Sequence, residues 1–344
     1  MRRNIILFFA AIFVIVTVFL FVNNKPMQAS KSTFVTVKGQ NLILNNQPFH
    51  SVGVNRYNLL TQDMNGHYIG CGSSFTDAQI NTLFSQLHGL GVTTVRFWLF
   101  QSFTNSGKDT TRFDYILSNA NQNNIKLIPV LENSLTDCTQ GGQKDTAWYT
   151  SGYKAPYGNY PLSFNDYIKK IVPLYKNNPA ILSWEIINEA KGDRNQGLYN
   201  FTRVLSQEIK SLDPNHLVSI SVNNADQPAE VTERLSEIKT IDFIPYHDYK
   251  QDTKAIPDKL QEIVKIAKKN KKPLIVGESG IQNKVPHRDK LFAAKMNAFF
   301  RSGGAAYLLW SFGDTYITDD GYNFTSSDPV AQVVKQTAEK ITKK

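Results

Sequence analysis

The chain has 344 residues, of which 41% are hydrophobic and 12% aromatic, and its formal net charge is +9. This length and apolar content suit one large folded domain or two ordinary ones and argue against a disordered or fibrous protein. Much of the positive charge lies in Lys pairs of the kind found at solvated helix ends, without any nucleic-acid-binding motif. We therefore expect no nucleic acid as a partner.

The N-terminal segment, residues 1–29, predicts export. Arg2 and Arg3 precede an uncharged run from Ile5 to Val22. This run is longer than the usual signal-peptide core of about 7–15 residues and just reaches the length that spans a bilayer. A cleaved signal peptide and an uncleaved anchor both fit, and both place residues 30–344 outside the cytoplasm because the positive charges stay inside. We expect an extracellular protein that contacts a membrane only through this segment, if it is retained.

Apolar, strand-like runs alternate with amphipathic, helix-like stretches after an N-terminal β-hairpin at residues 33–49. Strands are expected at residues 50–54, 94–99, 126–131, 181–187, 217–221, 241–246, 273–277 and 306–310. Helices are expected at residues 76–90, 113–124, 163–176, 196–212, 228–238, 258–271, 287–302 and 330–342.

These eight pairs predict an α/β fold, a (β/α)8 TIM barrel, because the nearly continuous apolar runs are typical of parallel strands buried on both faces. No Gly-x-Gly-x-x-Gly follows the first strand, which argues against a dinucleotide-binding fold. We expect residues 30–344 to form one catalytic domain and a monomer. The connection at residues 133–162 is long enough to predict a functional loop on the catalytic face.

Polar and aromatic residues gather at the predicted strand ends, where barrels of this type place their active sites. They are Asn55, Arg96, Trp98, Asn188, Glu189, His247, Tyr249, Glu278 and Trp310. Carboxylates supply acid, base and nucleophile chemistry, amides bind hydroxyls, and flat rings cover the apolar faces of sugar rings. The set therefore predicts a glycoside as the substrate.

Two segments carry a resemblance to a known family. Trp184-Glu-Ile-Ile-Asn-Glu-Ala190 resembles the strand-four signature of clan A glycoside hydrolases, and Leu274-Ile-Val-Gly-Glu-Ser-Gly280 resembles their strand-seven segment. With Arg96, the His247-x-Tyr249 pair and Trp310, the chain is similar to glycoside hydrolase family five over about residues 34–342. Many members carry a histidine after strand three, where this chain has Glu132-Asn133-Ser134. The family's mannanases often lack that histidine, so its absence favours mannan as the substrate.

The resemblance implies a retaining β-glycoside hydrolase acting on a β-linked polysaccharide or oligosaccharide, with β-1,4-mannan or β-1,4-glucan expected first. It implies Glu189 as acid/base, Glu278 as nucleophile and Asn188 as a ligand of the substrate 2-hydroxyl, without a metal or organic cofactor. A retaining pair needs carboxyls about 5–5.5 Å apart. We expect Arg96 and Tyr249 to keep Glu278 ionised, and the charge of Glu278 to raise the pKa of Glu189.

Structural interpretations stand beside these roles. Glu189 could cap a helix, Glu278 could pair with a lysine, and His247 could be a core histidine, although two glutamates at matching strand ends make a joint coincidence improbable. Glu185, four residues before Glu189, is interpreted as a group of the barrel interior. Trp98, Trp148 and Tyr153 fit a sugar platform and a packed core equally well.

Other functions also remain open. A catalytically inactive glycan-binding barrel, or a membrane-anchored interaction protein, would not need this intact set of polar strand-end residues. A transglycosylase would use the same two glutamates. The sequence does not predict the sugar, the linkage, or endo against exo action.

The chain has two cysteines, Cys71 and Cys138. They fall in the loops after strands one and three, which rise from the same face of a barrel. Export would expose them to an oxidising compartment, so we predict a disulfide that fixes a wall of the cleft; two unrelated buried thiols are the alternative. Neither cysteine belongs to a cluster of metal ligands.

Overall fold

The computed structural model of the protein describes residues 33–60, 75–191, 196–251, 254–313 and 321–342. Eight strands form one parallel sheet in the order β8-β7-β6-β5-β4-β11-β10-β9. They are β4 (Ser51–Asn55), β5 (Thr94–Trp98), β6 (Lys126–Val130), β7 (Ser183–Glu185), β8 (Leu217–Ser219), β9 (Ile244–Asp248), β10 (Leu274–Ser279) and β11 (Ala306–Leu309). The backbone N–H of Asp242, just before β9, donates to Val218 O of β8 at 2.8 Å, so the sheet curls into a nearly closed barrel.

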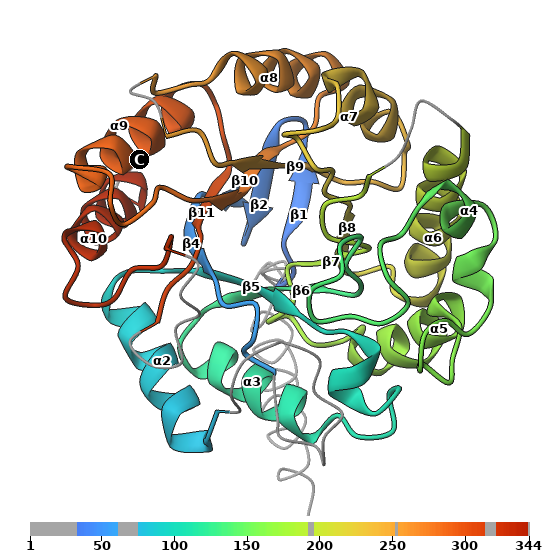
Figure 1. Ribbon diagram of the computed structural model, residues 1–344. Coiled ribbons are helices and arrows are strands. Elements are labelled where there is room, and N and C mark those ends of the chain that lie inside the picture. Colours follow the sequence, from blue (N-terminus) through green and yellow to red (C-terminus); the bar gives the residue numbers. More distant parts are fainter. Residues whose placement is uncertain (1–32, 61–74, 192–195, 252–253, 314–320, 343–344) are drawn as a thin grey trace, which may run out of the picture. The chain divides into compact units, whose positions relative to one another are not determined.

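Helices follow the strands and surround the barrel, as Figure 1 shows in the view along its axis. They are α2 (Asp77–Gly89), α3 (Thr111–Gln122), α5 (Phe164–Tyr175), α6 (Gln196–Leu212), α7 (Ala229–Ser236), α8 (Asp258–Asn270), α9 (Arg288–Arg301) and α10 (Pro329–Thr342). In α6, Leu198, Phe201, Leu205 and Ile209 are spaced three or four residues apart and are all buried, so one face of the helix meets the sheet. The predicted (β/α)8 barrel is confirmed.

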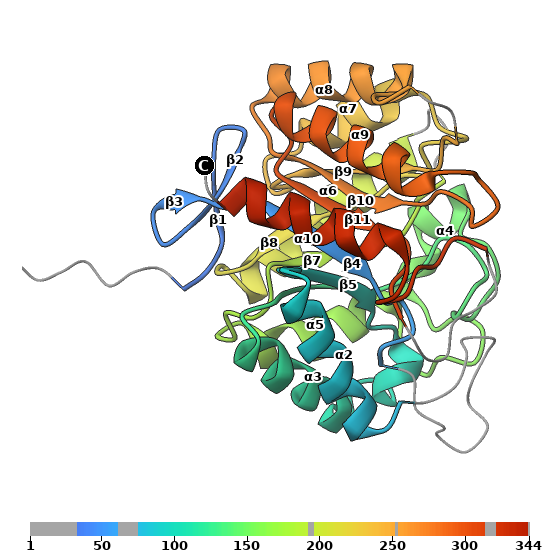
Figure 2. The same ribbon diagram turned by 90° about the vertical axis from the view of Figure 1, so that its left-hand side faces the viewer.

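The N-terminal hairpin lies at one end of the barrel, on the left in Figure 2. Strands β1 (Thr36–Lys38) and β2 (Asn41–Leu44) pair antiparallel around Gly39, whose φ of +60° suits the tight turn, and β2 also pairs with β3 (Gln47–Pro48). Val35 and Leu42 join an apolar cluster with residues from the N-terminal ends of the barrel strands. The hairpin segment thus contributes to the packing at the N-terminal end.

Element boundaries agree with expectation where capping signals are strong. Thr76 forms a capping box with Gln79 at the start of α2, and the Ser163 side chain accepts from Asp166 N at the start of α5. The predicted sixth strand was placed too early: β9 starts at Ile244 and β10 continues to Ser279, so His247 and Glu278 lie within strands rather than after them.

The connection between β6 and α5 is more ordered than a plain loop. It contains α4 (Thr146–Thr150) and the 3-10 helix η2 (Gly152–Lys154), and a further 3-10 helix, η1 (Gln101–Thr104), follows β5. The buried Glu132 carboxylate accepts hydrogen bonds from the hydroxyls of Thr139 and Tyr157 and lies 3.8 Å from Lys144 Nζ. These contacts tie the connection to the end of β6.

Among the described residues, no helix is both long and apolar enough to cross a bilayer. The predicted signal or anchor at residues 1–29 lies outside the described residues.

Candidate active site

Arg96 on β5 is the centre of a buried polar network at the C-terminal ends of the strands. Its guanidinium makes a two-pronged contact with Glu185, with Nε to Oε2 at 3.0 Å and Nη2 to Oε1 at 2.6 Å. It also donates from Nη1 to Glu278 Oε1 at 2.6 Å and to Asn55 Oδ1 at 3.1 Å, and from Nη2 to Asn188 Oδ1 at 2.7 Å. Burial alone lowers the pKa of Arg96, but the charges of Glu185 and Glu278 outweigh burial and raise it. Arg96 is therefore a permanent cation between two carboxylates.

Glu278 on β10 has a donor on each carboxylate oxygen. Arg96 donates to Oε1, and the Tyr249 hydroxyl donates to Oε2 at 2.6 Å. These two charge-assisted bonds fix the orientation of the carboxylate. The expected contacts of Arg96 and Tyr249 with Glu278 are both present.

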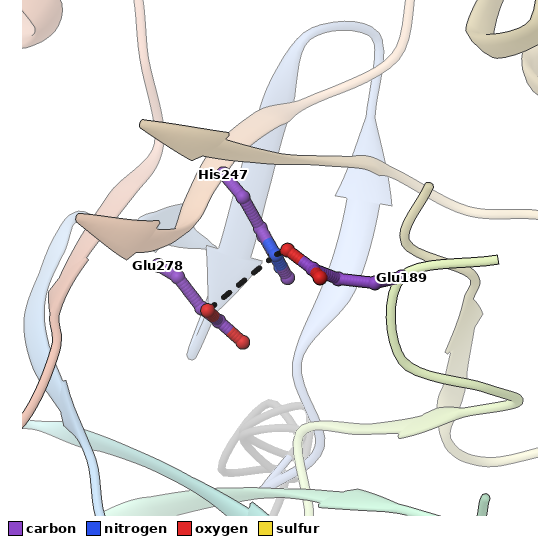
Figure 3. A group of neighbouring side chains, drawn as sticks. All are labelled: Glu189, His247 and Glu278. Atoms are coloured by element: carbon purple, nitrogen blue, oxygen red, sulfur yellow. Dashed lines mark hydrogen bonds and ion pairs between the residues drawn. The ribbon is translucent and has the colours of Figure 1, made fainter. Parts of the chain in front are cut away.

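Glu189 follows β7 and faces Glu278 across His247. His247 Nδ1 lies 2.9 Å from Glu189 Oε1 and 3.5 Å from Glu278 Oε2, and Figure 3 shows the three side chains converging from different elements. One carboxylate oxygen of each glutamate and one ring nitrogen of His247 all lie within 4.8 Å of one another. The two glutamates, 89 positions apart in the chain, thus share one small site.

The backbone at Glu189 is held in an unusual conformation. Its φ is +47°, a left-handed value that costs a non-glycine residue on the order of 1–3 kcal/mol. Two hydrogen bonds to Ser221 hold this turn: Glu189 N donates to Ser221 Oγ at 3.0 Å, and Ala190 N donates to Ser221 O at 2.9 Å. These hydrogen bonds stabilise the left-handed turn, and the turn directs the Glu189 side chain into the site.

One electrostatic expectation is wrong for the ligand-free protein. Burial acts to raise the pKa of Glu189, but the hydrogen bond from His247 and its charge outweigh burial, so that pKa is lowered rather than raised. Burial acts to lower the pKa of His247, but the charge of Glu278 and the contact with Glu189 raise it above its usual value. No feature of the sequence indicated that an imidazole lies between the carboxylates.

Strand β8 and the residues after it contribute groups that the sequence analysis missed. Ser221 Oγ donates to Glu185 Oε1 at 2.7 Å while it accepts from Glu189 N. Asn223 Nδ2 lies 3.4 Å from Glu189 Oε2, and Asn224 Oδ1 accepts from His247 N at 3.0 Å. The sequence signal was available, because Ser221 ends the predicted fifth strand, as the other candidates end theirs.

Glu185 and Asn55 support the network. Glu185 is buried as expected, and Arg96 lowers its pKa against the opposing effect of burial. Asn55 donates to Gly277 O at 2.8 Å and accepts from Arg96, so this predicted substrate ligand is engaged in holding Arg96 and β10.

The aromatic candidates divide into two groups. The half-buried Trp310 stacks on Tyr57, which follows β4 and was not among the predicted substrate ligands, at 5.3 Å between ring centroids. Trp98 is buried, stacks on Phe100, and has the Arg96 guanidinium 4.9 Å from its ring centroid. Trp310 is thus the more accessible ring, whereas Trp98 supports Arg96.

Trp148 and Tyr153 lie in a separate aromatic cluster. Their ring centroids lie 5.5 Å and 5.1 Å from that of Phe201 on α6, and Trp148 also contacts Phe164 on α5. Both side chains are buried, which favours the packed-core interpretation for these two residues.

Of the two cysteines in the predicted Cys71–Cys138 bridge, the structure describes only Cys138. Cys138 is buried and has a φ of +64°, whereas Cys71 lies outside the described residues. The disulfide therefore stays a prediction.

Glu189, His247 and Glu278 are close enough together to hold a metal ion. However, Arg96 lies 2.6 Å from Glu278 and competes electrostatically with any divalent cation there. The donors on these oxygens suit a pair of carboxyls that exchange protons better than a metal centre.

The chain resembles known proteins along most of its length. A mannan endo-1,4-beta-mannosidase F of Aspergillus fumigatus is 28% identical over 350 residues, which cover 88% of this chain and 75% of that protein. A mannan endo-1,4-beta-mannosidase A of Podospora anserina is 24% identical over 75% of this chain and 79% of its own. The endo-1,4-beta-mannanase structure from Rhizomucor miehei has the same fold, with a TM-score of 0.72 at 24% identity over 90% of this chain and 100% of that one.

A sequence model of the family Cellulase (glycosyl hydrolase family 5) matches residues 52–315, which is more than half of the chain. The chain belongs to glycosyl hydrolase family 5, which confirms the predicted class of retaining β-glycoside hydrolases.

Proposed function

We propose that this protein is a retaining endo-β-1,4-mannanase in which Glu278 is the nucleophile and Glu189 is the acid/base. One observation carries the proposal: the two glutamates face each other with oxygens within 4.8 Å, and Glu278 alone has both oxygens bound by Arg96 and Tyr249. Retaining pairs lie about 5–5.5 Å apart, against about 6.5–9.5 Å for inverting pairs. The short separation supports the retaining mechanism.

The unequal surroundings of the two glutamates assign their roles. Glu278, oriented by Arg96 and Tyr249, attacks the anomeric carbon, and the bond to the leaving oxygen breaks as Glu189 protonates that oxygen. Glu189 then accepts a proton from water, which attacks the glycosyl-enzyme and releases Glu278. Arg96 cannot serve as the acid because its pKa is raised and it is fully buried.

The proton that Glu189 delivers is shared with His247. The hydrogen bond between them lowers the pKa of Glu189 and raises that of His247, so the protonation of each group affects the other and the two titrate as a pair. A leaving oxygen that displaces His247 from Glu189 would leave the proton on the carboxyl. His247 is therefore a proton partner of the acid/base in this proposal.

Mannan is favoured over glucan for two reasons. Relatives that match most of the chain are mannan endo-1,4-beta-mannosidases, and the segment Glu132-Asn133-Ser134 lacks the histidine that many members of the resembled family carry after strand three. Both the preference for mannan and the endo mode belong to the proposal. Transglycosylation by the same two glutamates, and glycan binding without catalysis, are the alternatives that the experiment must separate.

The test is hydrolysis of mannan, glucomannan, β-glucan and short aryl glycosides by the purified protein, with Glu278→Gln as the inactive control. We expect mannan to be cut into oligosaccharides with a kcat/KM at least about tenfold above that for β-glucan. NMR of the first product should show the β-anomer before mutarotation. A first-formed α-anomer contradicts retention, and a preference for β-glucan contradicts the mannanase assignment.

Export forms a second part of the proposal. Arg2, Arg3 and the apolar run that follows support placing the catalytic domain outside the cytoplasm, where an oxidising environment would favour a Cys71–Cys138 disulfide. The bridge would close a span of 66 residues and stabilise the protein by about 4 kcal/mol in the chain-entropy model. Cell fractionation followed by mass spectrometry without reductant tests both statements. Cytoplasmic recovery, or two alkylatable thiols in the exported protein, would contradict them.

A further inference from the structure

Asn133 lies beside the proposed sugar ligand Asn188. The two residues form an isolated parallel bridge where β6 and β7 end, with Asn188 N donating to Glu132 O at 2.8 Å and Ser134 N donating to Asn188 O at 3.0 Å. Both side chains are buried, with 2% and 4% of their surface exposed. The backbone thus fixes the spacing between the two amides.

The side-chain amide of Asn133 has one permitted orientation. Its Nδ2 donates to Asp137 O at 2.9 Å, and its Oδ1 accepts from Leu135 N at 3.2 Å. Exchanging the two ends would place an NH2 group against an N–H and an oxygen against a carbonyl, losing both bonds. Asn133 therefore presents its oxygen, not its NH2 group, to Asn188.

Asn188 is consequently held from two sides. Its Oδ1 accepts from Arg96 Nη2 at 2.7 Å, and its Nδ2 donates to Asn133 Oδ1 at 3.1 Å. Arg96 determines which end of the amide is the oxygen, and Asn133 determines the plane in which Nδ2 lies. Within the part of the chain that the structure describes, the second Nδ2 hydrogen has no other acceptor. One N–H donor is left with a fixed direction.

We propose that Asn133 is a positioning residue that aims the remaining N–H of Asn188 at the 2-hydroxyl of the reacting sugar. The inference rests on the proposed function, because it assumes that Asn188 binds that hydroxyl. Without Asn133 the Asn188 amide can rotate about its hydrogen bond to Arg96, and its remaining N–H no longer points in one direction. The loss appears as slower turnover, because a contact with the 2-hydroxyl strengthens toward the transition state.

The test compares two substrates, dinitrophenyl β-mannobioside and its analogue lacking the 2-hydroxyl of the reacting sugar. Asn133→Leu removes all three hydrogen bonds of the side chain at similar volume. We expect it to lower kcat/KM about tenfold on the parent substrate, the worth of one hydrogen bond, and less than twofold on the 2-deoxy analogue. Asn133→Asp keeps an oxygen facing Asn188 and should recover most of the loss on the parent substrate.

Asn297→Leu is the matched control. Asn297 also bonds a local carbonyl, Ala293 O at 2.8 Å, but lies on α9, one of the helices outside the barrel. Its substitution should leave both kcat/KM values unchanged. Equal losses by Asn133→Leu on the two substrates overturn the inference, because a general structural defect does not distinguish them.

Failure of the proposed function has a different signature. If the wild-type protein cleaves neither substrate, the hydrolase assignment fails, and calorimetry with mannobiose and its 2-deoxy analogue decides the inference instead. Weaker binding by Asn133→Leu of the 2-hydroxyl ligand alone supports it, and an equal change for both ligands overturns it.

Discussion

The two ends of the barrel are built from opposite chemistry. At the C-terminal ends of the strands, Arg96, Glu185 and Glu278 are buried charges held by one another. At the N-terminal ends, an apolar cluster including Phe243, Ile275 and the hairpin segment's Leu42 is buried. Removing charges from water costs several kcal/mol per ion unless partners compensate, whereas burying apolar surface stabilises the fold.

The difference indicates that the two ends of the barrel have different roles. The apolar end stabilises the sheet, and the charged end holds reactive groups in positions that a protein selected only for stability would not need. Changes at the charged end should therefore lower activity more than stability, and changes at the apolar end should do the reverse.

The largest effect is expected at the proposed nucleophile. Glu278→Ala should lower kcat by about 10⁴-fold or more, the scale seen when covalent catalysis is removed. Arg96 keeps its two-pronged contact with Glu185, so the protein should remain folded. Azide should restore turnover and give the inverted α-glycosyl azide, detected by NMR. Residual activity within tenfold of wild type would contradict the assignment.

Substitution of the proposed acid/base should cause a loss of activity that depends on the leaving group. Glu189→Ala should nearly abolish cleavage of mannan, whose leaving group needs a proton, yet retain hydrolysis of dinitrophenyl glycosides, whose leaving group does not. Azide should now give a β-glycosyl azide with retained configuration. If Glu189→Ala gives the inverted azide and Glu278→Ala the retained one, the two roles are exchanged.

A substitution in the apolar cluster should have the opposite effect and lower stability more than activity. Phe243→Ala should destabilise the protein by about 3–5 kcal/mol, because a fully buried ring leaves a cavity. The kcat/KM of the folded fraction should change less than twofold. Denaturant unfolding and kinetics on the same sample check both, with Leu174→Ala as the exposed control, expected to cost under about 0.5 kcal/mol. A large kinetic defect in Phe243→Ala would end the proposed separation of the two ends.

The smallest effect concerns pH. The acid must be protonated, so kcat/KM should fall as pH rises through the upper apparent pKa of the Glu189–His247 pair, which lies above the usual histidine value of 6.5. In His247→Asn the lone Glu189 carboxyl titrates as a carboxyl does, and this basic limb should move to lower pH. An unmoved limb would show that His247 does not share the proton.

Much of the fold of this protein can be predicted from patterns of residues close together in the sequence. Helix α6 has the predicted bounds, Gln196–Leu212, because its apolar spacing and the Asp213-Pro214 stop signal are both local. The barrel follows from eight strand and helix pairs, and Glu189 and Glu278 from their positions relative to two strands. Such features are determined by residues close together in the sequence, where periodicity and capping act.

Only the tertiary structure determined which hydrogen bonds and ion pairs connect the site residues. Arg96 is shared by Glu185 and Glu278, and Ser221 joins Glu185 to the backbone of Glu189. His247 lies between the two glutamates and reverses the expected direction of the Glu189 pKa shift. These contacts join strands distant in sequence, and their lengths depend on barrel closure, strand register and the left-handed turn at Glu189. The sequence placed the residues at one end of a barrel, but a pKa depends on ångström separations that only the closed fold sets.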